Sequence, residues 1–287
     1  MYTIGIDIGA SKIAAALVRN GRILRFRKTE FKARGGHAIK QTVLRALDSV
    51  CGNARISSIG IGVPCIFTAA GRPSFCPNIR GLNPLELSRA IAKQYRVRVF
   101  MENDAKAAAM AELKYGAGRK SKNFVFVALG TGIGGAIIAD GKIYKGGLGW
   151  AGEFGHTIIK IQNSKSSAKS GSASGGKIQE YSEWERVSTK RFLRSKKTPK
   201  DVNEFAKTIA LGFVNITYAL APEYIVIGGG FLSLWDSQFN RKVLSAMRRM
   251  SILPGPSFPK IIRSKFGERA GVVGASLLMY DRRSTKK

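Results

Sequence analysis

The sequence is poor in acidic residues, histidine and cysteine. Its 287 residues contain 18 Asp and Glu against 48 Lys and Arg, with two histidines and three cysteines. Cys51, Cys65 and Cys76 form neither a CxxC pair nor the spacing of a disulfide framework, so the sequence predicts neither kind of site. Cysteine usage of this kind favours a cytoplasmic protein.

Long hydrophobic runs are also missing. No stretch approaches the roughly 18 uninterrupted apolar residues that a membrane helix needs. The start, MYTIGIDIG, has no basic leader before an apolar segment, so we expect no secretory signal, no membrane partner and a cytoplasmic location. Apolar content of 44% and 33 glycines instead predict a globular protein, long enough for two domains.

The scarcity of acidic residues gives a formal net charge of +30. Such a field attracts polyanions and steers anionic ligands toward a protein. The basic residues are spread over the chain, however, and no zinc-finger spacing, aromatic RNA-binding signature or helix-turn-helix accompanies them. Contact with nucleic acid stays open, but a solvated basic surface is the simpler interpretation, and charge alone indicates no function.

A pattern of strand, glycine-rich turn and strand occurs twice. The first copy is IGIDIGASKIAAALVRNGRIL and the second is NFVFVALGTGIGGAIIADGKIYK. Gly9 matches Gly130, and the hairpin turn Asn20-Gly21 matches Asp140-Gly141. The repeat predicts two related α/β domains, each opening with a three-stranded antiparallel meander.

The two glycine-rich turns can bring backbone N–H groups close to a bound anion. One turn alone is explained well enough as a tight hairpin, but a pair at matching positions favours a polyphosphate held from both sides. Periodicity places the other elements. We expect helices at 39–50, 85–95, 104–118, 201–222, 238–250 and 270–280, further strands at 56–67, 97–103 and 224–227, and a loop or linker at 164–177.

An acidic cluster, Glu102-Asn103-Asp104, lies between a predicted strand and an alanine-rich helix. Asp at the start of such a helix is ordinarily an N-cap. A carboxylate fixed at this junction is also suited to take a proton as a general base, because it is ionised at neutral pH. Both roles are compatible for Asp104, and we interpret Glu102 as a solvated or structural neighbour.

Taken together and in order, the motifs resemble the ROK sugar kinases of the actin-like, hexokinase-type ATPase superfamily. The pieces that carry the resemblance cover nearly the whole chain: Asp7-Ile8-Gly9-Ala10-Ser11-Lys12, PNIRGLN (77–83), Glu102-Asn103-Asp104, LGTGIGGA (129–136), GLGWAGEFGH (147–156), PEYIVIGGGF (222–231) and GVVGAS (271–276). The resemblance implies two actin-like (ribonuclease H-like) α/β domains around an interdomain cleft. Residues 1–113 would form the smaller domain and 114–270 the larger, with a helix in 271–287 packed back on the first.

The resemblance also implies an activity, which is ATP- and Mg²⁺-dependent phosphorylation of a hexose or N-acetylhexosamine hydroxyl with Asp104 as general base. The residues expected to bind the sugar are Asn78, Asn103, Asp104, Glu153, His156, Gln179 and Glu180. Those expected at the nucleotide are Gly9, Ser11, Lys12, Gly130, Thr131, Gly132, Gly228, Gly229 and Gly230. Asp7 would hold Mg²⁺ directly or through water.

The chain departs from the family pattern after GEFGH. Many ROK proteins carry a CxCGxxGCxE segment there, whose cysteines bind a structural zinc together with the motif histidine. This chain has Ser170, Ser172 and Lys177 at the cysteine positions, and these are poor zinc ligands, so we expect no zinc. Gln179 falls where the family has a sugar-binding Glu, with Glu180 one step on, which leaves the sugar open.

Two alternatives of the same fold stay open. Some family members are sugar-responsive repressors with an N-terminal DNA-binding domain, which we do not expect here because the phosphate hairpin begins at residue 2. A nucleotide-binding pseudo-kinase is the other, against which the presence of Asp7, Lys12, Asp104 and Glu153 argues. The expected partners are a small-molecule sugar and a nucleotide, and a homodimer stays open.

Overall fold

The computed structural model describes residues 1–9, 12–30, 35–77, 79, 81–160, 181–252 and 258–280. Four residues predicted to lie in the site fall outside these ranges: Ser11, Asn78, Gln179 and Glu180. The predicted linker 164–177 and the segment at which we expect no zinc lie outside them as well.

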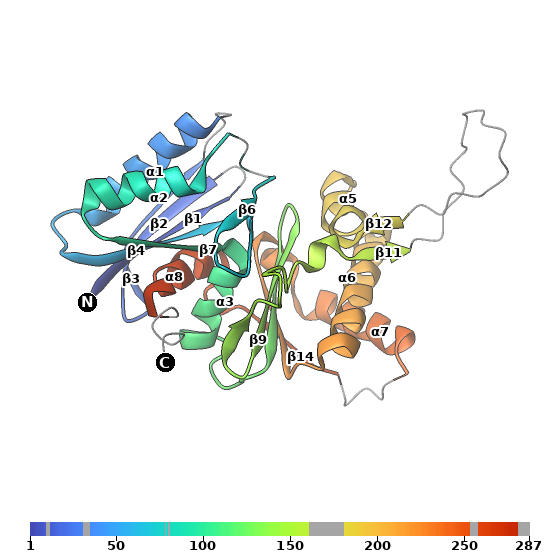
Figure 1. Cartoon of the computed structure of the whole chain (residues 1–287). Helices are drawn as coiled ribbons and strands as arrows, with labels where there is room; N and C mark the ends of the chain where they lie inside the picture. The colour runs from blue at the N-terminus through green and yellow to red at the C-terminus, as the bar shows by residue number, and fades with distance from the viewer. Residues whose placement is uncertain are drawn as a thin grey trace.

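Two five-stranded sheets organise the chain (Figure 1). The first has the order β3-β2-β1-β4-β7, formed by β1 (Tyr2–Ile8), β2 (Lys12–Arg19), β3 (Arg22–Glu30), β4 (Ile56–Val63) and β7 (Arg98–Asn103). The second has the order β10-β9-β8-β13-β14, formed by β8 (Phe124–Leu129), β9 (Ile133–Ala139), β10 (Lys142–Tyr144), β13 (Tyr224–Gly228) and β14 (Lys260–Arg263).

The two sheets have the same internal pairing. In each, the first three strands are antiparallel, and the fourth and fifth run parallel to the first. The matching turns Asn20-Gly21 and Asp140-Gly141 both have two residues at positive φ, as two-residue hairpins require. The predicted repeat of two strand meanders is therefore confirmed.

The helices lie close to their predicted positions. They are α1 (Gly36–Cys51), α2 (Pro84–Tyr95), α3 (Asp104–Tyr115), α4 (Trp184–Val187), α5 (Thr189–Arg194), α6 (Pro199–Leu220), α7 (Ser237–Met250) and α8 (Ala270–Ala275). The short helices α4 and α5 were not predicted, and α8 ends five residues earlier than expected. The remaining short elements are β5 (Ile66–Phe67), β6 (Pro73–Phe75), β11 (Ile158–Lys160), β12 (Tyr181–Glu183), and the 3₁₀ helices η1 (Phe154–His156), η2 (Gly230–Leu234) and η4 (Gly267–Arg269).

Two helices start slightly earlier than predicted because proline occupies their first turn. The side chain of Asn83 caps α2 ahead of Pro84, and Thr198 caps α6 ahead of Pro199. Thr198 and Asp201 form a reciprocal capping box. Proline is favoured at the first helical position because its missing N–H would have no partner there.

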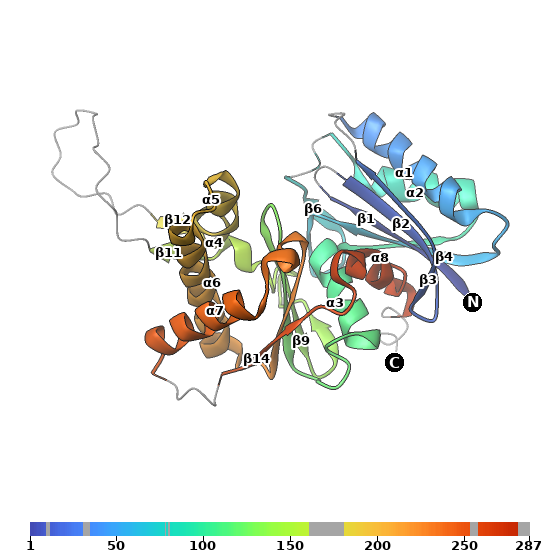
Figure 2. The same cartoon turned by 180° about the vertical axis from the view of Figure 1, so that it is seen from behind.

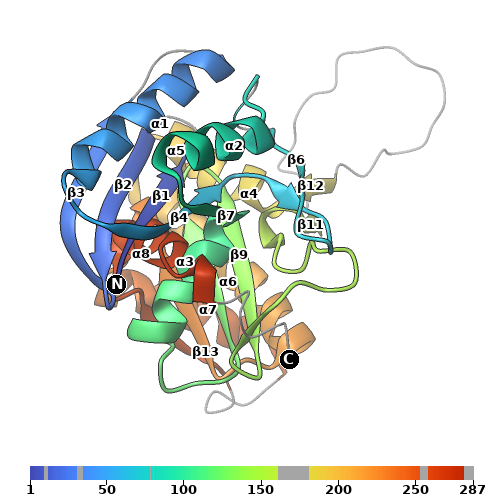
Figure 3. The ribbon, with the colours of Figure 1, turned by 60° about the vertical axis from the view of Figure 1, so that its left-hand side comes forward.

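Each sheet buries one face beneath two helices (Figure 3). Isoleucines that alternate along β1 and β4 pack against α1 and α2 in the first half. In the second half, alternate residues of β8 and β13 pack against α6 and α7. Phe205 of α6 also stacks on Phe192 of α5, with the ring centroids 4.4 Å apart. Because side chains alternate between faces of a strand, the opposite face of each sheet needs a separate cover.

Helices α3 and α8 supply that cover in a reciprocal way (Figures 1 and 2). Alanines of α3, from the first half, pack on Phe124 and Phe126 of the second sheet. Val272 and Val273 of α8, from the second half, pack on alanines of the first sheet. The two helices also contact each other: a Cβ on Gly274 would lie only 1.6 Å from the carbonyl oxygen of Ala107.

Glu112 connects the two chain segments that pass between the halves. Its Oε2 accepts hydrogen bonds from the N–H groups of Ala117 (2.7 Å) and Lys265 (3.2 Å). Its Oε1 accepts from the Ser264 hydroxyl (2.6 Å) and the Phe266 N–H (3.1 Å). A buried carboxylate thus ties the end of α3 to the loop between β14 and α8.

Two further findings concern the sequence expectations. Cys65 and Cys76 form a disulfide across the β5–β6 hairpin, a pairing that the cysteine spacing did not predict, while Cys51 is a free thiol. The pairing depends on the hairpin fold of the intervening residues, which sequence spacing does not show. Within the described ranges, no helix combines the length and apolar character needed to cross a membrane.

Candidate active site

Asp104 lies at the junction of β7 and α3, on the edge where the parallel strands of the first sheet end. Asp7 of β1 is aligned with Gly62 of β4, and Gly62 with Glu102 of β7. Asp104 follows two residues beyond Glu102, and a Cβ on Gly62 would lie 3.4 Å from its Cα. The carboxyl ends of parallel strands in α/β sheets commonly hold the ligand.

The helix cap at this junction is Asn103, which corrects the interpretation of Asp104 as an N-cap. The Asn103 Oδ1 accepts a hydrogen bond from the N–H of Lys106 (3.1 Å), and its Nδ2 donates to the carbonyl oxygen of Cys65 (3.2 Å). Asp104 is the first helical residue instead. Its Oδ1 accepts from the N–H of Ala105 (2.8 Å), and no described side chain donates to the carboxylate.

Two neighbouring carboxyl groups, Asp7 and Asp104, have raised pKa values. Burial raises the pKa of Asp104. Burial, together with the negative charge of Asp104, raises the pKa of Asp7 to about 7, and the Lys12 ammonium opposes this rise. Lys12 is itself half-exposed, with its Nζ 3.9 Å from a Glu268 oxygen. The pair of carboxylates therefore lacks full compensation by nearby protein cations.

A backbone hydrogen bond closes each of the two glycine turns. The N–H of Gly9 donates to the carbonyl oxygen of Lys12 (2.8 Å), and that of Gly130 donates to the carbonyl oxygen of Gly132 (2.9 Å). Thr131, between the latter two, is exposed. The Gly9 turn belongs to the first sheet, next to Asp7, and the Gly130 turn belongs to the second.

The third predicted glycine segment lies against the Gly130 turn. Gly229 has a φ of +86°, and a Cβ there would lie 2.3 Å from the carbonyl oxygen of Leu129. Only glycine fits this close approach. Gly228 packs on the ring of Phe126, whereas Gly230 has open space at its Cβ position.

Glu153 and His156, both predicted to bind sugar, lie at the two ends of η1: Glu153 directly precedes it and His156 is its last residue. Burial raises the pKa of Glu153, and the charges of Asp104 and Glu185 add to that effect. The positive charges of Lys106 and His156 oppose it. The charge of one predicted carboxylate, Asp104, thus acts on the pKa of the other, Glu153.

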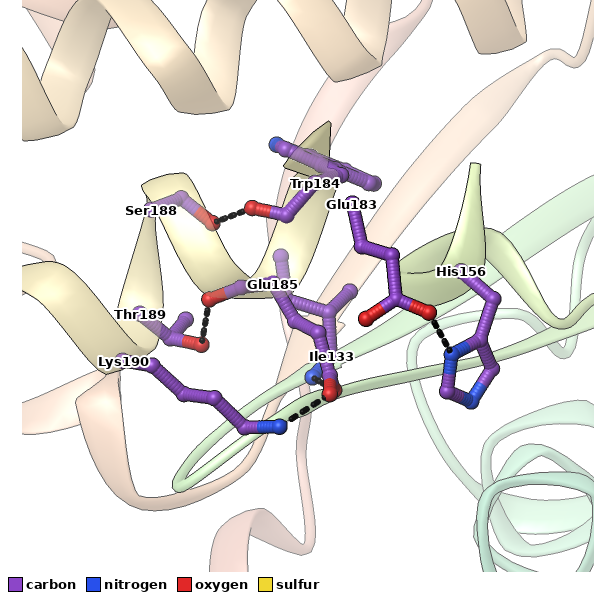
Figure 4. A network of polar contacts seen from close by, with 8 residues as sticks. All are labelled: Ile133, His156, Glu183, Trp184, Glu185, Ser188, Thr189 and Lys190. Atoms are coloured by element: carbon purple, nitrogen blue, oxygen red, sulfur yellow. Dashed lines mark hydrogen bonds and ion pairs between the residues drawn. The ribbon is translucent and has the colours of Figure 1, made fainter. Parts of the chain in front are cut away.

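Sequence reasoning missed Glu185 of α4 (Figure 4). Its Oε2 accepts a hydrogen bond from the N–H of Ile133 (3.1 Å), and its Oε1 pairs with Lys190. A Cβ on Gly132 would lie 2.4 Å from that Oε2, so this buried carboxylate lies directly beside the Gly130 turn. In the sequence, Glu185 stands out only as the one acidic residue of the strongly basic segment 184–200. That position indicates no role.

His156, Glu183 and Glu185 form the one group within the described ranges that could offer three ligand atoms to a metal ion, all within 4.8 Å of one another. Figure 4 shows His156 and Glu183 facing each other, and their Nδ1 and Oε1 atoms are 3.0 Å apart. Glu185 is engaged by Lys190 and Ile133. Protein partners therefore already contact all three side chains, and we assign no metal to them.

Two lysines beside the site were also missed. Lys145 Nζ lies 2.5 Å from Glu102 Oε2, and Lys106 Nζ donates to the carbonyl oxygen of Gly149 at 2.7 Å. Glu102 is buried, so its interpretation as a structural neighbour is correct and that as a solvated residue is wrong. Lys106 is the one charged residue in the otherwise apolar stretch 105–111, a signal that was visible in the sequence but indicated no role.

Comparison with known proteins finds one family over nearly the whole chain. The family model described as the ROK family matches residues 3–282 of the chain. N-acetylmannosamine kinase from Haemophilus influenzae is 28% identical over 303 residues, which cover 98% of this chain and 96% of that protein. A xylose repressor from Caldicellulosiruptor bescii is 27% identical over 246 residues, which cover 76% of this chain and 61% of the repressor.

A solved structure extends the similarity to three dimensions. The crystal structure of a ROK family glucokinase from Streptomyces griseus, in complex with glucose and AMPPNP, matches with a TM-score of 0.76 at 25% sequence identity. The match covers 97% of this chain and 99% of that one. The likeness thus includes both sheets and the segments that carry the predicted site.

Proposed function

The chain belongs to the ROK family, and from this membership we propose that it transfers the γ-phosphate of ATP to a hydroxyl of a hexose or N-acetylhexosamine. Its two-sheet architecture is the actin-like fold that the sequence predicted. Relatives of the chain are sugar kinases, which supports a sugar phosphotransferase. The particular sugar and the roles of individual residues belong to the proposal.

Asp104 carries the proposal as the general base. Its carboxylate lies at the end of the parallel strands, and among the described residues the hydrogen bonds that it accepts come from backbone N–H groups, including that of Ala105. Burial raises its pKa, which makes it a better proton acceptor than an exposed aspartate. It would take the proton from the sugar hydroxyl as that oxygen attacks the γ-phosphorus in line with the leaving group.

The glycine turns suit the phosphates of ATP. Backbone N–H groups near Gly9 and Gly130 would bind phosphate oxygens, with Lys12 adding a positive charge. A glucokinase of the same fold was solved with AMPPNP, which supports nucleotide use. Phosphoryl transfer requires mostly positioning and charge neutralisation, and such turns can provide both.

The donor set near these turns fits Mg²⁺. Carboxylate oxygens are the ligands that this ion prefers, and Asp7 offers one whose charge is not fully compensated by protein cations. Asp7 would hold the ion directly or through a water molecule. The ion would supply positive charge at the transferring phosphoryl group.

The sugar side of the site would be formed by carboxylates and one imidazole. Glu153 and His156 are the predicted sugar ligands, and Glu185 lies close enough to Glu153 to affect its pKa. We add Glu185 to this set because it lies beside the Gly130 turn and its charge acts on Glu153. Carboxylates and imidazole suit a substrate rich in hydroxyl groups because each accepts hydrogen bonds from them.

A substrate screen tests the proposal. ADP release would be measured with ATP and Mg²⁺ over glucose, fructose, N-acetylglucosamine, N-acetylmannosamine and allose. We expect saturable turnover with at least one sugar and loss of it when Mg²⁺ is chelated. Absence of turnover with every sugar, from protein shown to be folded, would overturn the proposal.

A sugar-responsive regulator is the second candidate, and the similarity to a xylose repressor favours it. The +30 charge is compatible with DNA contact. Sequence-selective DNA binding that changes when sugar is added, and that weakens as salt is raised, would support this function. Binding that is equal for all DNA sequences and insensitive to sugar would reject it.

We further propose that the domains comprise residues 1–113 and 114–270, with the C-terminal helix on the first. The packing of α8 against the first sheet supports this division, because Cβ atoms on Gly5 and Gly60 would each lie 1.8 Å from a carbonyl oxygen of α8. Limited proteolysis followed by mass spectrometry would test the boundaries. A cytoplasmic location is also part of the proposal, and the Cys65–Cys76 disulfide removes the support that cysteine usage gave to it.

A further inference from the structure

Lys106 is an unusual residue at its place in the fold. It stands in the sequence Asp104-Ala105-Lys106-Ala107, in the first turn of α3, and only 1% of its surface is exposed. Lysine is almost never fully buried unless a partner compensates its charge. An alanine-rich helix packed between two sheets gains nothing from such a side chain by packing alone, so its charge needs a separate explanation.

The ammonium of Lys106 contacts a segment from the other half of the molecule. Its Nζ donates a hydrogen bond to the carbonyl oxygen of Gly149, 2.7 Å away. Gly149 has a φ of +92°, and a Cβ there would lie 2.3 Å from the carbonyl oxygen of Phe67. The segment that follows β10 therefore lies tightly against the first half at this point, and Glu153 is four residues farther along it.

The charges around Lys106 are not shared evenly. Burial lowers the pKa of Lys106, and the two carboxylates Glu102 and Glu153 oppose this effect. Glu102 already has Lys145 as an ion-pair partner at 2.5 Å. Glu153 makes no ion pair with any lysine or arginine among the described residues, while the negative charges of Asp104 and Glu185 act against its ionisation. Lys106 and His156 are the cations that favour it, Lys106 most strongly.

We propose that Lys106 is a positioning residue for sugar binding. Its ammonium anchors the segment from Gly149 to Glu153 on α3 and supplies a positive charge that acts on the Glu153 carboxyl group. The proposal rests on the proposed function, in which Glu153 binds the sugar. In this proposal the hydrogen bond to Gly149 anchors the segment, and the positive charge of Lys106 acts on Glu153. The two effects can therefore be separated by substitution of Lys106.

Three variants separate them. Lys106→Met removes both the hydrogen bond and the charge, Lys106→Gln keeps a donor without the charge, and Lys106→Arg keeps both. Lys114→Met is the matched control, because Lys114 is exposed on the same helix. Thermal unfolding of each variant would show that it is folded before binding is compared.

Sugar affinity and its pH dependence are the measurements. Calorimetric titration of sugar without nucleotide gives Kd, and steady-state kinetics give the KM for sugar and for ATP between pH 5 and 8. We expect Lys106→Met to weaken sugar binding about tenfold, as the loss of one charge-assisted contact would, with the KM for ATP unchanged. Lys114→Met should match the parent protein.

The pH profile distinguishes positioning from a merely structural role. Removing a positive charge raises the pKa of a nearby carboxyl, so the acidic limb of sugar binding should move to higher pH in Lys106→Met and Lys106→Gln. His156, Asp104 and Glu185 remain to act on Glu153 in both variants. Lys106→Arg should keep the limb in place, and Glu153→Gln should abolish it.

Each outcome decides a different statement. If the parent protein binds sugar and Lys106→Met binds it equally well at every pH, the Lys106 proposal is overturned and the kinase proposal stands. If sugar binds but is not phosphorylated, the kinase proposal fails and the Lys106 proposal is still decided by the Kd values. If no sugar binds to the folded parent protein, both are overturned.

Discussion

The ends of β7 and β14 occupy equivalent places in the two halves. Each is the fifth strand of a sheet with the same order and pairing, and each leads to a helix that packs on the opposite sheet. After β7 the chain enters α3 at once, and Asp104 presents a carboxylate that no described side chain engages. After β14 it passes through Ser264, whose hydroxyl donates to Glu112.

The two junctions share one backbone arrangement but differ in what their side chains can do. Equivalent junctions could both have carried reactive groups, but only the first has an acidic residue with unused hydrogen-bonding capacity. In the second, the N–H and O–H groups are satisfied by a buried carboxylate from the first half. Repetition therefore supplies the framework, and the chemistry we propose depends on residues that differ between the copies.

The largest expected effect comes from Asp104→Asn. We expect kcat to fall on the order of 10²–10⁴-fold with sugar binding nearly unchanged, because the amide cannot accept the proton. Ser264→Ala at the equivalent junction is the control. Its kcat should fall by less than about threefold, because the substitution removes one neutral hydrogen bond. Comparable losses in the two variants would remove the distinction between the junctions.

The next effect concerns the contact between α3 and α8. Gly274→Ala would place a Cβ 1.6 Å from the Ala107 carbonyl oxygen, so backbone must move. We expect a loss of about 3 kcal/mol in the free energy of unfolding, measured by urea denaturation. Gly147→Ala is the control because nothing lies within 4 Å of its Cβ position. A stable Gly274→Ala protein would contradict the close approach of the two helices.

Glu112→Gln should have a smaller effect. The amide group of glutamine would direct hydrogens at donors such as the Lys265 and Ala117 N–H groups, and the charge-assisted bonds would be lost. We expect about 2 kcal/mol of destabilisation. Glu204→Gln, which breaks only the exposed pair with Lys207, should cost less than about 0.5 kcal/mol. Equal midpoints for the two variants would refute the structural role of Glu112.

The last expected effect is measured as a slope and not as a fixed loss, and it is the pH dependence of stability that comes from Asp7. Its pKa is about 7 in the folded chain and 3.8 as a free side chain. Between these values the folded state binds more protons than the unfolded state, so the free energy of unfolding falls as pH rises from about 4 to 7. Asp7→Asn should flatten this slope in urea titrations without divalent cations. Parallel slopes in both proteins would show that Asp7 does not titrate in this range.

Sequence patterns predicted much of this framework because they depend on local rules. The meanders follow from alternating apolar residues and from turns such as Asp140-Gly141, and the long helices from their 3.6-residue periodicity. Short elements such as α4 have too few residues for a periodic signal. The break of the predicted strand 56–67 after Val63 likewise follows from the fold, with β5 pairing to β6 instead.

The site was predictable only where a residue stands in a recognisable motif. Asp104 and Glu153 were predicted in this way, and in the structure the charge of Asp104 acts on the pKa of Glu153. Glu185 and Lys106 could not be assigned because their roles come from contacts with Ile133 and Gly149, 52 and 43 residues away in sequence. The capping of α3 by Asn103 rather than Asp104 depends on where the last strand residue turns, which propensity does not resolve to one position.

The backbone contact between Gly274 and Ala107 has a mechanical consequence. Two helices that touch through main-chain atoms have little room to slide past each other at that point, so a rotation of one half about this contact is the relative motion that we expect them to allow. Asp104 lies three residues from Ala107, about 4.5 Å along the helix. A rotation about this contact would therefore move the Asp104 carboxylate only a short distance, while groups far from the contact would move much farther.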